Sequence, residues 1–318
     1  MRISILDQAP ISTHMTAEEA LGNTVKLASV ADQLGFTRFW LAEHHGMKGL
    51  SSSAPEVTLG AIGMITKEIR LGSGATLLPY YKPLKVAETF NTLLVLHGDR
   101  IDVGIGRAPG GDNVASEALS DNYLGHVFKM PDLVSELKAL LMNKRENLKV
   151  MPDSQHKVKM WMLGTSEKSA IFARDNQLNY CYGEFMSGQS TGEVLSTYKA
   201  DSNKGEIIVT VNAFCGGTYE EAERMARPYL VNQALKSTGR EFSGIPSFDE
   251  VSAIELTEEE VAELNKVRDN VIIGDADFVR DKLMAYQRTY GVDELMIVTI
   301  THDFTDKVNS YKRIAEVM

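Results

Sequence analysis

The feature that most constrains the fold of this chain is a repeated alternation of short apolar segments with helical patterns. The apolar segments have the length and composition of buried strands, and the 318 residues divide into units of about 40 residues. Such alternation is typical of a parallel sheet covered by helices. The eight expected strands cover residues 2–6, 38–42, 69–78, 101–106, 159–163, 179–183, 206–214 and 294–300.

Eight strand–helix units predict an α/β fold, a (β/α)8 TIM barrel that forms one domain over residues 1–318, with its active site at the C-terminal ends of the strands. The main alternative is a doubly wound open sheet, which usually carries a glycine-rich dinucleotide-binding turn after its first strand. Here the first strand is followed by Asp7-Gln8-Ala9-Pro10, which is not such a turn. The barrel is therefore the favoured fold.

The composition and net charge of the chain argue against nucleic acid and membrane as binding partners. The net charge is −10, whereas a nucleic-acid footprint needs clustered Lys and Arg. The longest apolar runs are far shorter than the roughly 20 residues that span a bilayer, and the N-terminus shows no signal-peptide pattern. The only cysteines, Cys181 and Cys215, imply no disulfide framework. We expect a cytoplasmic protein with reduced thiols that binds neither nucleic acid nor membrane.

Three titratable residues, Glu43, His44 and His45, directly follow the second expected strand. Carboxylate and imidazole are zinc ligands, so a metal hydrolase is one interpretation. Adjacent residues on a strand point to opposite faces, however, so the two imidazoles cannot easily share a metal. Most other strand tips carry Gly, Ala, Thr and Ser instead of further ligands. We therefore expect no metal, with one imidazole facing the site and the other packed.

Two neighbouring strand tips look like anion sites. The segment Gly164-Thr165-Ser166-Glu167-Lys168-Ser169 offers backbone N–H groups and hydroxyls at a helix N-terminus, which suits a phosphate. Arg107 lies on a glycine-flanked turn and can supply a bidentate cation. For either motif alone, a capped helix or a solvated arginine is the simpler interpretation. Glycines within the third strand, in Gly72-Ser73-Gly74, indicate a bulge or the close approach of a ligand or backbone.

Four motifs occur together in an order and spacing that resemble one family. They are Trp40 to His45, Gly74 to Pro79, Gly104 to Gly110 and Gly164 to Ala170. The set resembles the bacterial luciferase-like flavin-dependent monooxygenases, and the Gly-Arg-Ala-Pro-Gly turn is most similar to the single-gene, luciferase-like branch. The resemblance implies a barrel that takes reduced FMN as co-substrate, binds O₂ and oxidises a small organic substrate.

The resemblance also implies roles for residues of the four motifs. His44 matches a catalytic histidine near the reactive side of the flavin ring, and its ordinary pKa near neutral pH suits a general acid or base. Glu43, also assigned to the catalytic set, lies beneath the flavin end of the same strand. Gly74 and Ala75 match a non-proline cis peptide on which the ring rests. The phosphate clamp corresponds to Arg107, Gly164, Ser166 and Ser169.

Further expectations concern loops and partners. Residues 143–159 form a surface excursion, and an insertion after strand seven, at 237–270, matches a mobile lid. Because no dinucleotide fingerprint appears, a separate flavin reductase is expected to supply reduced FMN. The resemblance implies a homodimer through the helices after strands two and three. Light-emitting subunits carry a reactive cysteine where this chain has Gly106, which argues against light emission.

Two other functions on the same barrel stay open at this point. One is a reductase linked to a deazaflavin or to NAD(P)H, which would transfer hydride without taking up O₂. The other is a flavin-binding protein without turnover, and the presence of Glu43 and His44 favours an enzyme over it. No motif specifies the substrate.

Overall fold

The computed structural model describes residues 1–144 and 147–318, which form a closed barrel of eight parallel strands. Strand β6 pairs with β7, β7 with β9, and β9 with β1, which closes the sheet. The predicted (β/α)8 barrel is confirmed. Its strands are β1 (Arg2–Asp7), β2 (Arg38–Leu41), β3 (Arg70–Leu77), β4 (Ile101–Gly106), β5 (Lys159–Gly164), β6 (Asn179–Gly183), β7 (Ile207–Cys215) and β9 (Glu294–Val298).

A ninth strand, β8 (Val271–Gly274), lies outside the barrel circuit. Residues 271–274 are not among the eight strands expected from the sequence. Strand β7 is nine residues long and pairs with β9 through residues 208–212, so its last residues extend beyond this pairing. There, residues 212–215 pair with β8. The extra strand thus depends on the length of β7.

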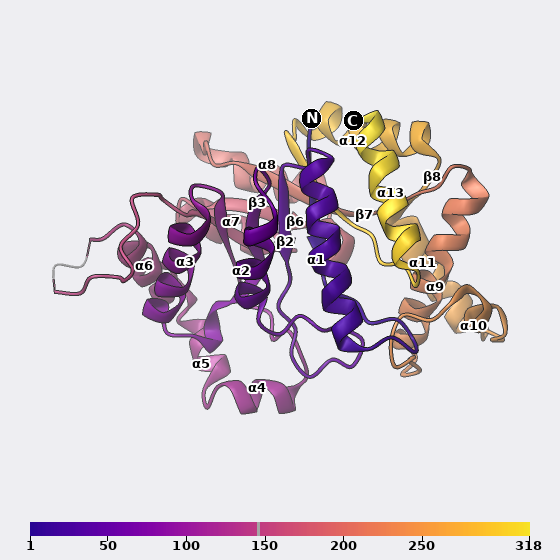
Figure 1. Ribbon diagram of the computed structural model, residues 1–318, viewed down its shortest axis with the longest axis horizontal. Coiled ribbons are helices and arrows are strands. Elements are labelled where there is room, and N and C mark those ends of the chain that lie inside the picture. The colour runs from indigo at the N-terminus through magenta and orange to yellow at the C-terminus, as the bar shows by residue number, and fades with distance from the viewer. Residues whose placement is uncertain (145–146) are drawn as a thin grey trace.

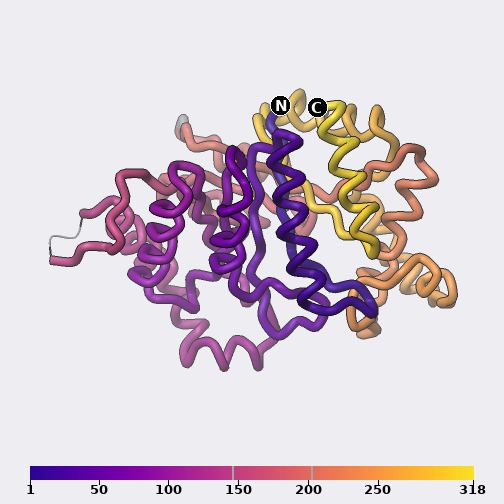
Figure 2. Tube along the Cα trace, viewed as in Figure 1, coloured from indigo at the N-terminus to yellow at the C-terminus, as the bar shows by residue number. Residues whose placement is uncertain are grey.

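The helices surround the barrel, and both chain termini lie at the same end, as expected where β1 pairs with β9 (Figure 1). The Cα trace follows the same path and shows the two termini close together at one end (Figure 2). The α-helices are α1 (Ala17–Gln33), α2 (Pro55–Ile65), α3 (Pro83–His97), α4 (Asn113–Leu119), α5 (Tyr123–Phe128), α6 (Met130–Leu141), α7 (Glu167–Asp175), α8 (Thr191–Lys199), α9 (Tyr219–Ser237), α10 (Phe248–Ser252), α11 (Glu258–Asp269), α12 (Ala276–Tyr290) and α13 (Phe304–Val317). Three short 3-10 helices are η1 (Leu78–Tyr80), η2 (Glu184–Met186) and η3 (Ala200–Ser202).

Local sequence signals explain several helix starts. Thr16 and Glu19 have the sequence spacing of a capping box and form one at the start of α1, and Pro83, a residue type favoured in a first turn, opens α3. Within the insertion predicted at 237–270, acidic residues begin α11, where Thr257 and Glu260 form a capping box. Acidic residues in a first turn favour a helix because they oppose the positive end of its dipole.

The core has two parts that follow the alternation of side chains along the strands. In β2, Phe39 and Leu41 belong to the cluster that packs against the surrounding helices. Between them Trp40 joins a second cluster, where its ring meets Trp161 edge to face at 5.4 Å. Strand residues thus alternate between the helix-facing core and the barrel interior.

A buried guanidinium connects three strands inside the barrel near their N-terminal ends. Arg38 is 1% exposed, and it donates to Asp102 of β4 at 2.6 Å and to Glu294 of β9 at 2.7 Å. The guanidinium also lies 4.8 Å from the ring centre of Trp161. Asp102 accepts further hydrogen bonds from Arg70 and Trp40. Buried charges are retained only when they are paired in this way.

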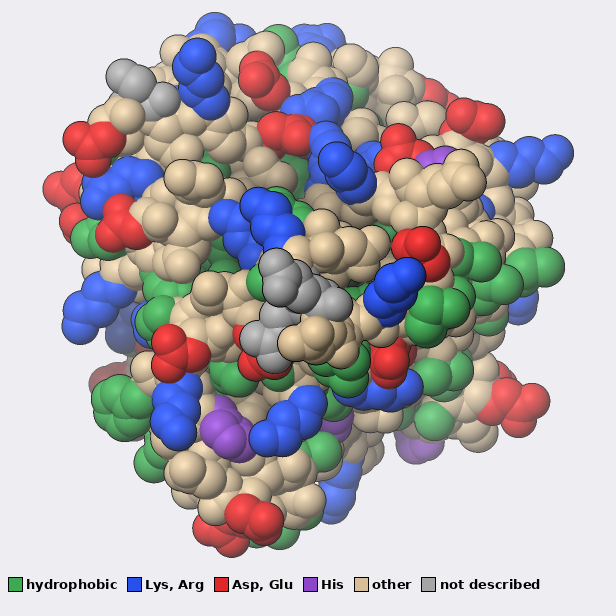
Figure 3. Space-filling view, turned by 90° about the vertical axis from the view of Figure 1, so that its left-hand side faces the viewer, with side chains coloured by type: hydrophobic (Ala, Val, Ile, Leu, Met, Phe, Trp, Pro, Cys, Tyr) green, Lys and Arg blue, Asp and Glu red, His purple; other side chains and the backbone are tan. Residues whose placement is uncertain are grey.

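The surface excursion predicted at 143–159 projects between α6 and β5 (Figure 1). Residues 145 and 146 of this prediction lie outside the described residues. The rest is largely exposed, but Val150 is buried and Asn91 of α3 donates to the carbonyl of Pro152. On this face, basic and acidic side chains are interspersed (Figure 3). Within residues 1–144 and 147–318, every helix is too short or too polar to cross a membrane.

The first prediction tests the buried guanidinium. Replacing Arg38 by Met removes the main cationic partner of two buried carboxylates, those of Asp102 and Glu294. We expect the free energy of unfolding to fall by about 3–5 kcal/mol, measured by urea denaturation followed by tryptophan fluorescence. Arg280→Met is the control, because Arg280 pairs with the exposed Asp277 on the surface. Equal stability of Arg38→Met and the wild type would show that the network is dispensable.

Candidate active site

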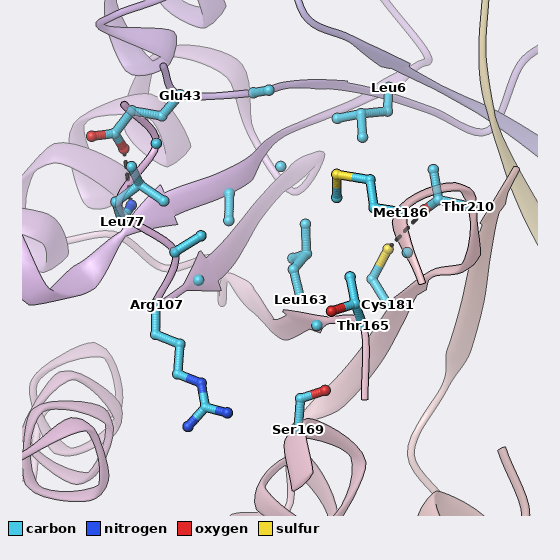
Figure 4. Close-up of a pocket in the computed structure, with 18 of the residues that line it drawn as sticks. Leu6, Glu43, Leu77, Arg107, Leu163, Thr165, Ser169, Cys181, Met186 and Thr210 are labelled. Carbon is cyan, nitrogen blue, oxygen red and sulfur yellow. Dashed lines mark hydrogen bonds between the residues drawn. The ribbon is translucent and has the colours of Figure 1, made fainter. Parts of the chain in front are cut away.

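A pocket of about 400 Å³ opens at the C-terminal ends of the strands (Figure 4). The tips of β2 to β6 contribute to its lining. The active-site location expected for a barrel therefore coincides with a cavity. The structure brings together in this pocket every candidate residue from the sequence, namely Glu43, His44, Gly74, Ala75, Arg107, Gly164, Ser166 and Ser169.

Glu43 connects the tip of β2 to the turn that follows β3. Its side chain is 1% exposed, and Oε2 accepts the backbone N–H of Leu77 at 2.9 Å. The other oxygen, Oε1, accepts from the Tyr81 hydroxyl at 2.6 Å and lies 2.8 Å from Nε2 of His45. Figure 4 shows the carboxylate turned toward Leu77 and away from the middle of the cavity. The carboxylate is thus occupied in holding the two tips together.

His44 and His45 occupy different surroundings. His45 contacts Glu43, and its ring meets Tyr80 edge to face at 6.0 Å. Its backbone N–H donates to the carbonyl of Gly110. His44 instead lines the pocket. This is the arrangement expected from adjacent residues on a strand tip, one in the site and one packed.

The imidazole of His44 is neutral at pH 7. Its Nδ1 is buried and has no hydrogen-bond partner among the described residues. Burial, together with the positive field of His45 and Lys236, lowers the pKa of His44 from 6.5 to about 4. The sequence suggested a pKa of His44 near neutral pH, and the pKa differs because burial and the approach of Lys236 come only from the tertiary fold. An unpartnered buried nitrogen in a cavity is a site for a ligand group or water.

The glycines of β3 accompany a bulge, as predicted, and glycines of β3 and β4 leave room for close neighbours. A Cβ on Gly74 would lie 2.6 Å from Leu6, and a Cβ on Gly104 would lie 2.2 Å from the carbonyl oxygen of Ser73. The β3–β4 register shifts between Ser73 and Thr76. Within that interval, the peptide bond between Gly74 and Ala75 is cis, as the family resemblance implied.

Arg107 follows β4 and is exposed at the pocket rim. Its guanidinium makes no ion pair with the described side chains of 1–144 and 147–318, while its carbonyl accepts a hydrogen bond from Tyr123 at 2.6 Å. Tyr123 stacks on Tyr80 at 4.9 Å, and burial raises the pKa of Tyr123 to about 12, so its hydroxyl stays a donor at pH 7. The α5 segment thereby fixes the backbone of Arg107.

Ser166 and Ser169 cap the start of α7. Ser166 is the N-cap and forms a reciprocal capping box with Ser169. The Ser169 hydroxyl also lies 2.9 Å from that of Tyr180. Figure 4 shows the Arg107 guanidinium and Ser169 on the same side of the cavity. The predicted helix cap is present, and this N-terminus lines the pocket on the same side as the Arg107 guanidinium.

The remaining wall was not identified from the sequence. It is formed by Leu6, Leu163, Cys181, Met186 and Thr210. The thiol of Cys181 lies 3.2 Å from the Thr210 hydroxyl, and burial raises the pKa of Cys181 to about 12, so the thiol is protonated. Inward alternation along the strands is the signal that could have found most of these residues. Met186 lies beyond a strand end and gives no such signal.

The segment predicted as a lid, 237–270, is docked on the loop after β1. Ile245 exchanges backbone hydrogen bonds with Ile11 and Thr13, and Thr13 donates to Glu250 at 2.6 Å. His302 contacts the carbonyl of Ile245 at 2.9 Å. Lid mobility stays a prediction. Among the described residues, no group of three His, Cys, Asp or Glu side chains is arranged to hold a metal ion.

The site can now be compared with known proteins. A model of the luciferase-like monooxygenase family matches residues 1–293. The uncharacterised protein YwcH of Bacillus subtilis is 35% identical over 99% of this chain and 98% of its own. The N-acetyl-S-alkylcysteine monooxygenase of the same bacterium is 30% identical over 100% of this chain and 98% of its own. The crystal structure of apo-MsnO8 superimposes with a TM-score of 0.89 at 33% identity, covering 99% of this chain and 98% of that one.

The second prediction follows from the burial of His44. An NMR titration of the imidazole should show a midpoint near pH 4 instead of 6.5, with the signal assigned by its loss in His44→Asn. In the unfolded chain this imidazole binds its proton already near pH 6.5, so protonation favours unfolding. The free energy of unfolding should therefore fall progressively as the pH falls from 6.5 toward 4. A midpoint close to 6.5 would contradict the burial argument.

Proposed function

This chain belongs to the luciferase-like monooxygenase family, and from that premise we propose that it uses reduced FMN and O₂ to oxidise a small organic substrate. Members of this family are flavin-dependent oxygenases. The observation that carries the proposal is the pocket, because an exposed cation, the N-terminus of a helix and a neutral imidazole all line the same cavity. A phosphate-bearing redox cofactor needs both an anion site and a group that can handle a proton.

The residues at the rim suit the phosphate of FMN. Arg107 is fixed through its carbonyl by Tyr123, and its guanidinium is available for a charge-assisted hydrogen bond. The first turn of α7, from Gly164 to Ser169, adds backbone N–H groups and the positive end of a helix dipole. The backbone at Gly74 and Ala75 provides a surface for the ring. When bound, reduced flavin supplies two electrons to O₂, so that one oxygen atom enters the substrate and the other becomes water.

His44 is the group placed to handle a proton. Because its imidazole is neutral at pH 7, it can accept a proton from a substrate, and its unpartnered Nδ1 can bond a polar atom in the cavity. The apolar wall of Leu6 and Leu163 limits water in the same space. Glu43 stands beside the cofactor site and keeps Leu77 and Tyr81 in place. A separate flavin reductase supplies the reduced flavin in this proposal.

The third prediction separates cofactor binding from chemistry with two variants. Arg107→Ala should weaken FMN binding by about 10- to 100-fold, since a hydrogen bond to a charged group contributes about 1.5–3 kcal/mol. His44→Asn should bind FMN nearly as the wild type does, yet lose about 10²- to 10⁴-fold in product formation. FMN fluorescence titration measures the first quantity, and mass analysis of products with chemically reduced FMN measures the second.

The control for the cation is Lys168→Ala, because Lys168 is exposed on the same turn of α7 but does not line the pocket. Unchanged FMN affinity in Arg107→Ala would refute the clamp. Oxidation of a substrate by hydride transfer, with no O₂ uptake, would refute the monooxygenase and favour a deazaflavin-linked or NAD(P)H-linked reductase. FMN binding with neither O₂ incorporation nor product from a broad panel would favour a flavin-binding protein without turnover.

We also propose a homodimer through α2 and α3, which pack side by side (Figure 1). An exposed apolar stripe runs along α2 through Val57, Met64 and Ile65, and α3 adds Val95 and Leu96. Each of these side chains is at least half exposed in the single chain, and a grouped apolar surface of this kind marks a protein interface. A two-fold symmetric contact would cover the same stripe on both copies.

The fourth prediction tests this interface. Met64→Glu places a charge in the stripe and should shift the protein from dimer to monomer in light scattering. Val114→Glu is the matched control, since Val114 is equally exposed (74% against 73%) but lies on α4. A wild-type protein that is monomeric at all concentrations would exclude the dimer.

A further inference from the structure

One residue of the pocket combines high exposure with an oxidisable side chain. Met186 ends η2, directly after β6, and is 64% exposed although it lines the same cavity as His44 and Arg107. Figure 4 shows its thioether directed into the cavity, in the space between Leu6 and Cys181. The sulfur thus lies inside the cavity that is proposed above to hold the substrate and the reduced flavin.

The backbone that carries Met186 is held in place. Glu184, at the start of η2, accepts hydrogen bonds from the hydroxyls of Thr191 and Tyr286. Ser187, directly after Met186, donates through its hydroxyl to the carbonyl of Thr165 at 2.8 Å. The two ends of the short helix are therefore held by α8, by α12 and by the loop after β5. These contacts hold the backbone at Met186, so the position of the thioether is set by the rotamer of its own side chain.

The second sulfur in the pocket is a poorer target. The thiol of Cys181 is 1% exposed and shares a hydrogen bond with Thr210. The thiolate is the reactive form of cysteine, and burial keeps this thiol protonated. A thioether has no proton to lose, and its lone pairs stay available at any pH. Met186 is thus the accessible two-electron reductant of the cavity.

We propose that Met186 is an internal substrate of the site, converted to methionine sulfoxide when reduced flavin and O₂ react without an external substrate. The proposal rests on the monooxygenase function proposed above. One reduced FMN gives two electrons and two protons, and the thioether gives two electrons. These four electrons reduce one O₂, so that one oxygen atom forms the S=O bond and the other leaves as water, together with oxidised FMN.

The product would alter the pocket. A sulfoxide is polar and larger than a thioether, and it would stand against the apolar side chains of Leu6 and Leu163. Turnover without substrate should therefore inactivate the enzyme progressively. A bound external substrate should protect, because it occupies the space in front of the sulfur and consumes the oxidant.

The fifth prediction is tested by peptide mass analysis. Wild-type protein receives repeated additions of chemically reduced FMN in air, with catalase present to remove free hydrogen peroxide. Trypsin releases residues 175–199, in which Met186 is the single methionine, and fragment ions separate it from Cys181. Met142 and Met151 are internal controls, since they are 52% and 57% exposed and lie outside the pocket. Proximity should oxidise Met186 about tenfold faster than either, or more.

Two variants complete the test. Arg107→Ala, at an FMN concentration that saturates only the wild type, should lose the preference for Met186. In Met186→Leu, activity measured against its own starting rate should decline more slowly than in the wild type over substrate-free turnovers.

Equal oxidation of Met186, Met142 and Met151 would overturn the proposal, because free peroxide acts on every exposed thioether alike. An unmodified Met186 in protein that does oxidise an external substrate would overturn it while leaving the monooxygenase function standing. Protein that forms neither sulfoxide nor any product with reduced FMN would overturn both.

Discussion

The buried pairing of Arg38 with Asp102 and Glu294 is the constraint on which the barrel depends. A guanidinium in a low-dielectric interior is tolerated only if carboxylates reach it with good geometry, and these carboxylates belong to β4 and β9, on either side of β2. The pairing therefore fixes three strands relative to one another near their N-terminal ends. Trp40 and Trp161 fill the interior beside it. The free volume is left at the opposite ends of the strands, where the pocket lies.

Strand β2 connects this buried ion-pair network to the active site. Arg38 is the first residue of β2, and Glu43 lies two residues beyond its last. One short segment therefore supplies a hydrogen-bonded side chain at each end of the barrel interior. Glu43 accepts three hydrogen bonds from the chain, of which the bond from Leu77 N–H joins the tip of β2 to that of β3. His44 lies next to this anchor. The catalytic imidazole of the proposal is thus positioned by packing and hydrogen bonds that it does not itself make.

Much of this was predictable because it depends on local pattern. Apolar runs and helix caps located eight strands and the first turns of α1 and α3, and residues at strand tips must meet at one end of a parallel barrel. Strand β8 was missed because its pairing depends on how far β7 extends past β9. The pKa of His44 was misjudged because burial and Lys236 come from distant segments. The hydrogen-bond partners of Glu43 and the position of Met186 in the pocket likewise depend on contacts between distant segments.

The charges of the pocket suggest why these distant contacts matter. The cation that suits a phosphate is at the rim, where Arg107 is exposed to water and its charge costs little. Deeper in, burial keeps His44 and Cys181 neutral at pH 7, and the Glu43 carboxylate is turned away from the cavity and surrounded by donors. A reactive oxygen species held there would meet an interior without a thiolate or a charged imidazole. The lifetime of that species would then depend on the substrate or water that enters the cavity and on the exposed thioether of Met186 in its wall.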